Sequence, residues 1–105
     1  MRITISHKKT KTEVVESVNR SFDQLFQGVA GIPVRVVVEQ KNWQGSTLSF
    51  LVTAKMGLMS TPIRGTVEVT DHDVSVEADL GLLEKLVPAE TVRDVMGRQI
   101  KGLLE

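Results

Sequence analysis

Asp71-His72-Asp73 brings together the residue types that bind metal ions or move protons in catalytic sites. Three consecutive residues rarely converge on one ion in extended chain, because neighbouring side chains of a strand point to opposite faces. Aspartate also favours tight turns, since its carboxylate accepts hydrogen bonds from the nearby backbone. We therefore interpret this segment as a hairpin turn. We predict no metal site and no cofactor.

The basic run His7-Lys8-Lys9-Thr10-Lys11 could contact phosphate or an anionic surface. The whole chain nevertheless carries 13 basic and 13 acidic residues, a net charge of zero. The expected solvent face of the sheet also lacks aromatic side chains that would stack on bases. We therefore expect an exposed loop here and no nucleic-acid partner. Neither a nucleophile motif nor a glycine-rich phosphate loop is recognisable, so we predict that the protein is not an enzyme.

Apolar residues in predicted loops are the more suggestive candidates for a binding surface. Leu58 and Met59 follow Gly57 in a predicted loop over 57–62, and methionine adapts to irregular apolar surfaces. They could dock a partner or simply cover the margin of the core. Trp43, in a predicted turn over 41–45, has the same two interpretations: a partner-binding anchor or a lid over the open end of the core.

The elements that must position these residues follow from hydrophobic periodicity. Alternating apolar and polar residues predict strands, and apolar residues three and four apart predict amphipathic helices. A capping box from Thr10 to Glu13 marks the start of the first helix. The predicted strands cover residues 2–6, 34–40, 48–56, 63–70 and 74–80. One predicted helix covers 11–27, a short helical turn lies near 82–86, and a closing helix follows Pro88 with an apolar stripe from Val92 to Leu103.

This order predicts a two-layer α+β domain that spans residues 1–105. It has one antiparallel sheet of about five strands, with both helices on the apolar face. Gly28 and Gly31 would end the first helix, while Gly97 and Gly102 would let the closing helix pack closely against the sheet. An available sheet edge permits a homodimer.

Val37 and Leu51 are apolar exceptions on the solvent face, and they form either a small partner-binding patch or a cross-strand pair. A second hypothesis places an apolar ligand between the sheet and the C-terminal helix. The residues that would line this space are Phe50, Val67, Val76, Met96 and Ile100. The protein would then be a small carrier, by analogy with helix-grip domains that bind lipids, although small domains usually fill such a space with side chains.

The chain has no cysteine, which suits a reducing compartment, and no apolar run that approaches the roughly 20 residues of a transmembrane span. Its N-terminus lacks the apolar region of a signal peptide. We therefore expect a cytoplasmic protein.

Several short motifs resemble a known bacterial family. Trp43-x-Gly45-x-x-Leu48-x-Phe50 resembles a W-x-G-x-x-L-x-F segment of the small polyhydroxyalkanoic acid system proteins. The segments 65–69 and 74–83 are similar to the hairpin and L-G-[FL]-L hinge of that family, and 86–90 is similar to the start of its closing helix. The resemblance implies an accessory protein of the polyester-granule system, with no established site residues. Our leading hypothesis is thus a non-enzymatic protein that binds a protein partner or a hydrophobic granule surface.

Overall fold

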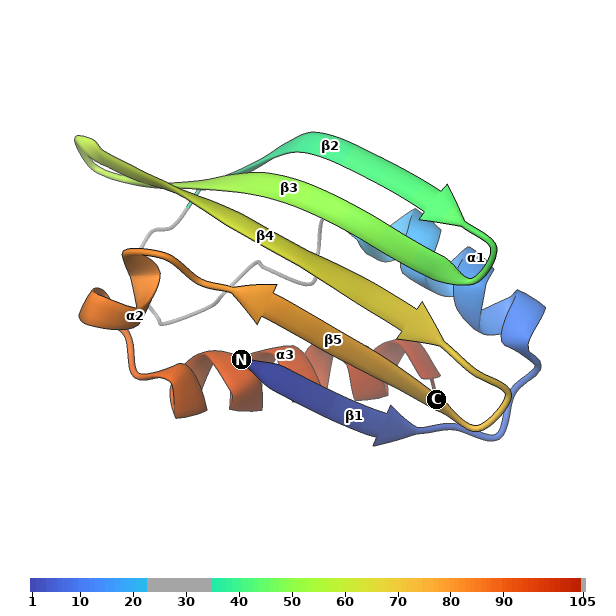
Figure 1. The fold of residues 1–105 in the computed structure, drawn as a ribbon. Coiled ribbons are helices and arrows are strands. Elements are labelled where there is room, and N and C mark those ends of the chain that lie inside the picture. The colour runs from blue at the N-terminus through green and yellow to red at the C-terminus, as the bar shows by residue number, and fades with distance from the viewer. Residues whose placement is uncertain (23–34, 105) are drawn as a thin grey trace.

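Five antiparallel strands and three helices make up the part of the chain that the computed structural model describes, residues 1–22 and 35–104. Figure 1 shows the elements in chain order. They are β1 (Arg2–Ser6), α1 (Lys11–Ser21), β2 (Arg35–Gln44), β3 (Thr47–Met56), β4 (Met59–Val69), β5 (Asp73–Asp79), α2 (Leu83–Leu86) and α3 (Ala89–Leu104). The strand order is β1-β5-β4-β3-β2. The predicted α+β fold is confirmed.

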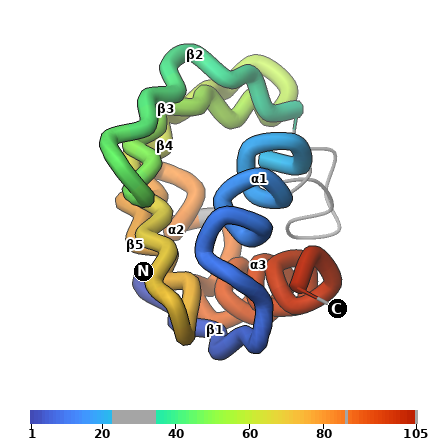
Figure 2. Tube along the Cα trace, turned by 90° about the vertical axis from the view of Figure 1, so that its right-hand side faces the viewer, coloured from blue at the N-terminus to red at the C-terminus, as the bar shows by residue number. Residues whose placement is uncertain are grey.

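The sheet curves around α1 and α3, which lie on its inner face (Figure 2). Alternation in β3 turns Leu48, Phe50 and Val52 inward, and all three are buried. Each helix adds one apolar stripe to the same core: Val14, Val18 and Phe22 from α1, and Val92, Met96 and Ile100 from α3. Removing this apolar surface from water is the main force that joins the two layers.

β1 lies at one edge of the sheet, where it pairs with β5 and brings Ile3 opposite Val76. α1 then carries the chain across the inner face, since β2 forms the opposite edge. The predicted capping box is present in part. The Thr10 hydroxyl accepts a hydrogen bond from the Glu13 backbone N–H (3.2 Å) and donates one to the Glu13 carboxylate (3.0 Å).

β2 is longer than the sequence suggests, and the predicted turn over 41–45 is wrong. The strand runs to Gln44, and Gly45 with φ of 60° begins the tight turn into β3. The cause is a β-bulge between Val38 and Gln40, which inserts one extra residue and shifts the register. Inward-facing positions therefore change from even to odd numbers, which hides the second half of the strand from a simple alternation rule.

The loop predicted over 57–62 is also largely strand. Gly57, with φ of 62°, and Leu58 form a two-residue turn, and β4 begins at Met59. Pro62 lies inside β4, opposite Thr53 of β3. The strand tolerates this proline because β5 pairs with β4 only from Arg64 onward, so no N–H is required on that side.

Other predictions lie partly or wholly outside the described residues. The described part of α1 ends near Phe22, so the predicted helix over 23–27, its end at Gly28 and Gly31, and the start of the second strand at 34 are outside them. No helix of the described residues is long and apolar enough to cross a membrane.

Candidate functional site

The tip of the β3–β4 hairpin extends beyond the body of the domain (Figure 1). Met56 pairs with Met59 across the hairpin, and Leu58 occupies the turn between them. The Leu58 side chain is fully exposed, at 107% of its reference area, and Met59 is 48% exposed. Met56 is partly buried against the core, which fixes the base of the tip. Leu58 and Met59 therefore lie at the exposed end of the paired β3 and β4 strands and do not cover the core margin.

Two cations lie beside this hairpin tip. Arg35 of β2 pairs with Lys55 of β3, and Lys55 is one residue before Met56. Both side chains are exposed on the outer face, the sheet face opposite α1 and α3. Glu39 is the nearby carboxylate, and it accepts a hydrogen bond from the Thr53 hydroxyl at 3.0 Å. The tip thus combines a fully exposed apolar end with a modest excess of positive charge.

Val37 and Leu51 both lie on the outer face and are half-buried. They do not face each other directly, because Val37 pairs with Thr53 and Leu51 pairs with Gln40 across the bulge. The two residues are therefore diagonal neighbours on adjacent strands. They lie between the hairpin tip and the middle of the sheet, and the polar side chains of Thr53, Lys55 and Arg35 separate them from Leu58 and Met59.

Trp43 lies at the other end of the sheet from Leu58, where β2 turns into β3. Its ring is half-buried against the core, and its indole N–H donates to the Asn19 side-chain oxygen at 3.0 Å. Lys41 donates to the Asn19 backbone oxygen at 2.8 Å, and its ammonium lies 5.5 Å from the centroid of the Phe22 ring. These contacts bind β2 to α1. The structure thus supports the lid interpretation of Trp43 and separates it from the hairpin tip.

The five residues predicted to line a ligand space all belong to the hydrophobic core formed by the described residues. Their side chains are buried and pack in one cluster with α1 and α3: Phe50, Val67, Val76, Met96 and Ile100. The Phe50 ring meets the Phe22 ring edge-on, with centroids 5.1 Å apart. This packing gives the carrier hypothesis no support.

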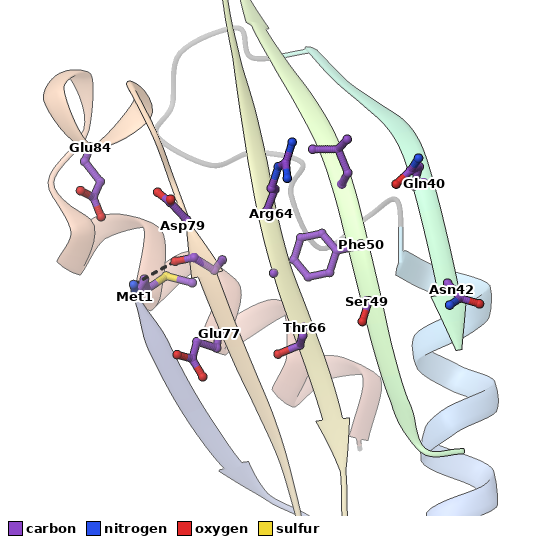
Figure 3. A pocket seen from close by; sticks show the side chains of 13 residues that line it. Met1, Gln40, Asn42, Ser49, Phe50, Arg64, Thr66, Glu77, Asp79 and Glu84 are labelled. Carbon is purple, nitrogen blue, oxygen red and sulfur yellow. Dashed lines mark hydrogen bonds between the residues drawn. The ribbon is translucent and has the colours of Figure 1, made fainter. Parts of the chain in front are cut away.

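A broad concave surface lies on the outer face, and sequence reasoning did not identify it (Figure 3). Its volume is about 960 Å³. Its floor includes Phe50, Gly65 and Leu51, and its polar wall consists of Gln40, Asn42, Ser49, Arg64, Thr66, Glu77, Asp79 and Glu84. Met1 and Ala78 complete the described lining. The alternation of apolar and polar residues identifies the outward-facing residues, but it does not indicate the curvature of the sheet that makes this surface concave.

The chemistry of this outer concavity is mixed. Arg64 is opposite Leu51 on one side and Asp79 on the other, so cationic, apolar and acidic groups occupy one row across three strands. Among the described lining residues no histidine or cysteine accompanies Ser49 and Thr66 to activate a hydroxyl. The surface can form hydrogen bonds with a polar molecule, but it has no arrangement that favours one reaction.

The two histidine segments have structural roles. His7 is buried; its Nε2 donates to the Thr70 carbonyl (2.8 Å), and its Nδ1 accepts from the Lys9 N–H (3.2 Å). Asp71-His72-Asp73 forms the predicted hairpin turn, closed by hydrogen bonds between Thr70 and Asp73. His7 therefore binds the first loop to this turn.

No family model, curated protein or solved structure matches this chain.

Proposed function

We propose that this chain is a non-enzymatic accessory protein of the cytoplasm that attaches to the surface of polyester granules through its β3–β4 hairpin tip. The observation that carries the proposal is the full exposure of Leu58 at the end of a protruding hairpin. The transfer of water-exposed apolar side chains into an apolar phase lowers the free energy of the system. The resemblance of residues 43–50 and 65–83 to polyhydroxyalkanoic acid system proteins supports polyester as that phase.

The expected attachment is weak and reversible. Full burial of Leu58 and Met59 would contribute about 1.5–3 kcal/mol each, and Met59 less because half of its surface is already covered. A total of roughly 2–4.5 kcal/mol corresponds to a dissociation constant in the millimolar range or weaker. Arg35 and Lys55 add attraction if the granule surface is anionic.

Co-sedimentation with polyhydroxybutyrate granules tests the proposal. Leu58→Asp together with Met59→Asp should move the protein from the pellet to the supernatant, because two carboxylates would have to enter the apolar phase. Leu82→Asp is the matched control, since Leu82 is also exposed (42%) but lies in the turn before α2. Equal sedimentation of wild type and the double variant would refute the hairpin tip as the attachment site.

A further inference from the structure

A groove runs along the free edge of β1, between that strand and α3, on the inner side of the sheet. It has a volume of about 330 Å³, and its described lining comprises Ile3, Thr4 and Ile5 from β1, and Arg93, Asp94, Gly97, Arg98 and Lys101 from α3. A Cβ atom added at Gly97 would have no neighbour within 4 Å, so the missing side chain leaves the middle of the groove open. The groove lies far from the hairpin tip in sequence and is independent of it.

Backbone N–H and C=O groups of β1 point along this groove and can pair with another strand. Met1 and Ala78 exchange two backbone hydrogen bonds of 2.9 Å. Bonded and non-bonded pairs alternate in an antiparallel ladder, so Ile3 and Ile5 also direct both backbone groups toward β5. The residues whose N–H and C=O groups then point away from β5 are Arg2, Thr4 and Ser6. In the described sheet no strand pairs with these groups, because β1 is at the edge.

The charges of the groove select the side chains of an incoming strand. Its lining holds three cationic side chains and one carboxylate, a net charge of +2. Arg98 also bonds its own helix, through Nε to the Asp94 carbonyl oxygen at 3.4 Å. Arg93 and Lys101 lie eight residues apart on α3, which corresponds to about 12 Å along the helix axis. Residues four apart on a strand are separated by about 13 Å and face the same side.

These dimensions match an extended segment with acidic residues at positions i and i+4. Its first carboxylate would meet Arg93, its second would meet Lys101, and the residue between them would lie over Gly97. A second copy of this chain fits poorly. Pairing of two β1 edges would bring the two α3 helices side by side, so that each groove would place its cations against those of the other.

We infer that the groove between β1 and α3 is a docking site for an extended acidic segment of a partner protein, which adds to the sheet as a sixth strand. Main-chain hydrogen bonds to Arg2, Thr4 and Ser6 supply affinity that does not depend on sequence. The cations of α3 supply the preference for acidic side chains at positions i and i+4, as side-chain contacts supply specificity in other cases of strand addition at a sheet edge.

A fluorescein-labelled peptide, Thr-Glu-Thr-Val-Thr-Glu-Thr, tests the inference by fluorescence polarisation and amide NMR titration. The peptide should bind saturably, and Thr-Lys-Thr-Val-Thr-Lys-Thr should not. Binding should slow hydrogen exchange at the amides of Arg2, Thr4 and Ser6. Arg93→Glu together with Lys101→Glu should weaken binding by about tenfold or more, because two attractive pairs become repulsive.

A backbone variant separates strand addition from simple charge attraction. Thr4→Pro removes an outward N–H that the β1–β5 ladder does not use, so it should abolish peptide binding, whereas Thr4→Val should retain it. Circular dichroism verifies the fold of each variant, and slowed hydrogen exchange at the Arg2, Thr4 and Ser6 amides of the wild-type protein decides between the two if Thr4→Pro is unfolded. Equal binding of the acidic and basic peptides, no binding at millimolar peptide, or a dimer that protects the β1 amides would overturn the inference.

Discussion

Two glycines of this chain should respond to the same substitution with opposite signs. Gly97 lies in the interior of α3, and a Cβ atom there would have nothing within 4 Å. Gly65 lies in β4, opposite Phe50, and a Cβ atom there would lie 2.7 Å from Cζ of the Phe50 ring and would collide with the Glu77 carbonyl oxygen. The substitution to alanine adds one methyl group at each position, so the structure around each glycine determines whether the free energy of unfolding rises or falls.

Gly97→Ala should stabilise the protein by about 0.8–1 kcal/mol, because alanine loses less backbone entropy than glycine when a helix forms. For a domain of this size, that gain corresponds to a rise in Tm of about 4–8 °C. Gly65→Ala should destabilise it by about 1–3 kcal/mol or more, since one of the two colliding atoms belongs to the backbone of β5 and cannot rotate away.

Urea unfolding followed by circular dichroism measures both changes. The slope of the free energy against urea should stay constant for Gly97→Ala, so that a shift in midpoint reports stability alone. Gly102→Ala is a matched control in the last turn of α3, with open space as well, and should give a smaller gain because helix ends fray. A lower midpoint for Gly97→Ala would show that the glycine permits close packing, as its position in the sequence suggested.

Two hydrogen bonds between distant segments give further predictions. Asn19→Ala removes the acceptor of the Trp43 indole N–H (3.0 Å) and should cost about 0.5–1 kcal/mol, with a red shift of Trp43 fluorescence, whereas Asn42→Ala on the outer face should change neither. Thr61→Val removes the buried hydroxyl that accepts from the Leu82 N–H (3.0 Å) and should cost about 1–3 kcal/mol, measured by thermal unfolding. An unchanged Tm for Thr61→Val would mean that this hydrogen bond does not hold the β5–α2 connection.

The sheet was predictable where alternation is unbroken. In β3 and β5 every buried side chain follows the period of two, from Leu48 to Ala54 and from Val74 to Ala78. The rule failed in β2 because the bulge after Val38 turned Lys41 and Trp43 inward. The Lys41 side chain stays exposed because β2 is an edge strand, and its ammonium donates to the Asn19 carbonyl of α1. That acceptor belongs to another element and is not visible from the local sequence.

The candidate site was predictable in residue type but not in placement. Leu58 and Met59 were recognisable as loop apolar residues, yet only the length of the paired strands shows that they protrude. Trp43 had two interpretations, a partner-binding anchor or a lid over the core, and its hydrogen bond to Asn19 of α1 fits the lid. The groove beside β1 depends on which strand forms the sheet edge, and pairing between residues 67 to 75 positions apart determines that edge.

The space beside the missing Cβ atom is occupied at Gly65 and open at Gly97. At Gly65 the aromatic ring of the neighbouring strand fills it, so Phe50 packs on Phe22 within the core and also lines the outer concavity. At Gly97 no neighbouring atom fills this space, although replacement of the glycine by any residue except proline would raise the helix propensity. A glycine that costs stability, at a position where an added Cβ atom would meet no neighbour, is expected where a surface must stay open, and at this position that surface is the basic groove along β1. Gly97→Gln should therefore stabilise α3 relative to wild type and still weaken binding of the acidic peptide.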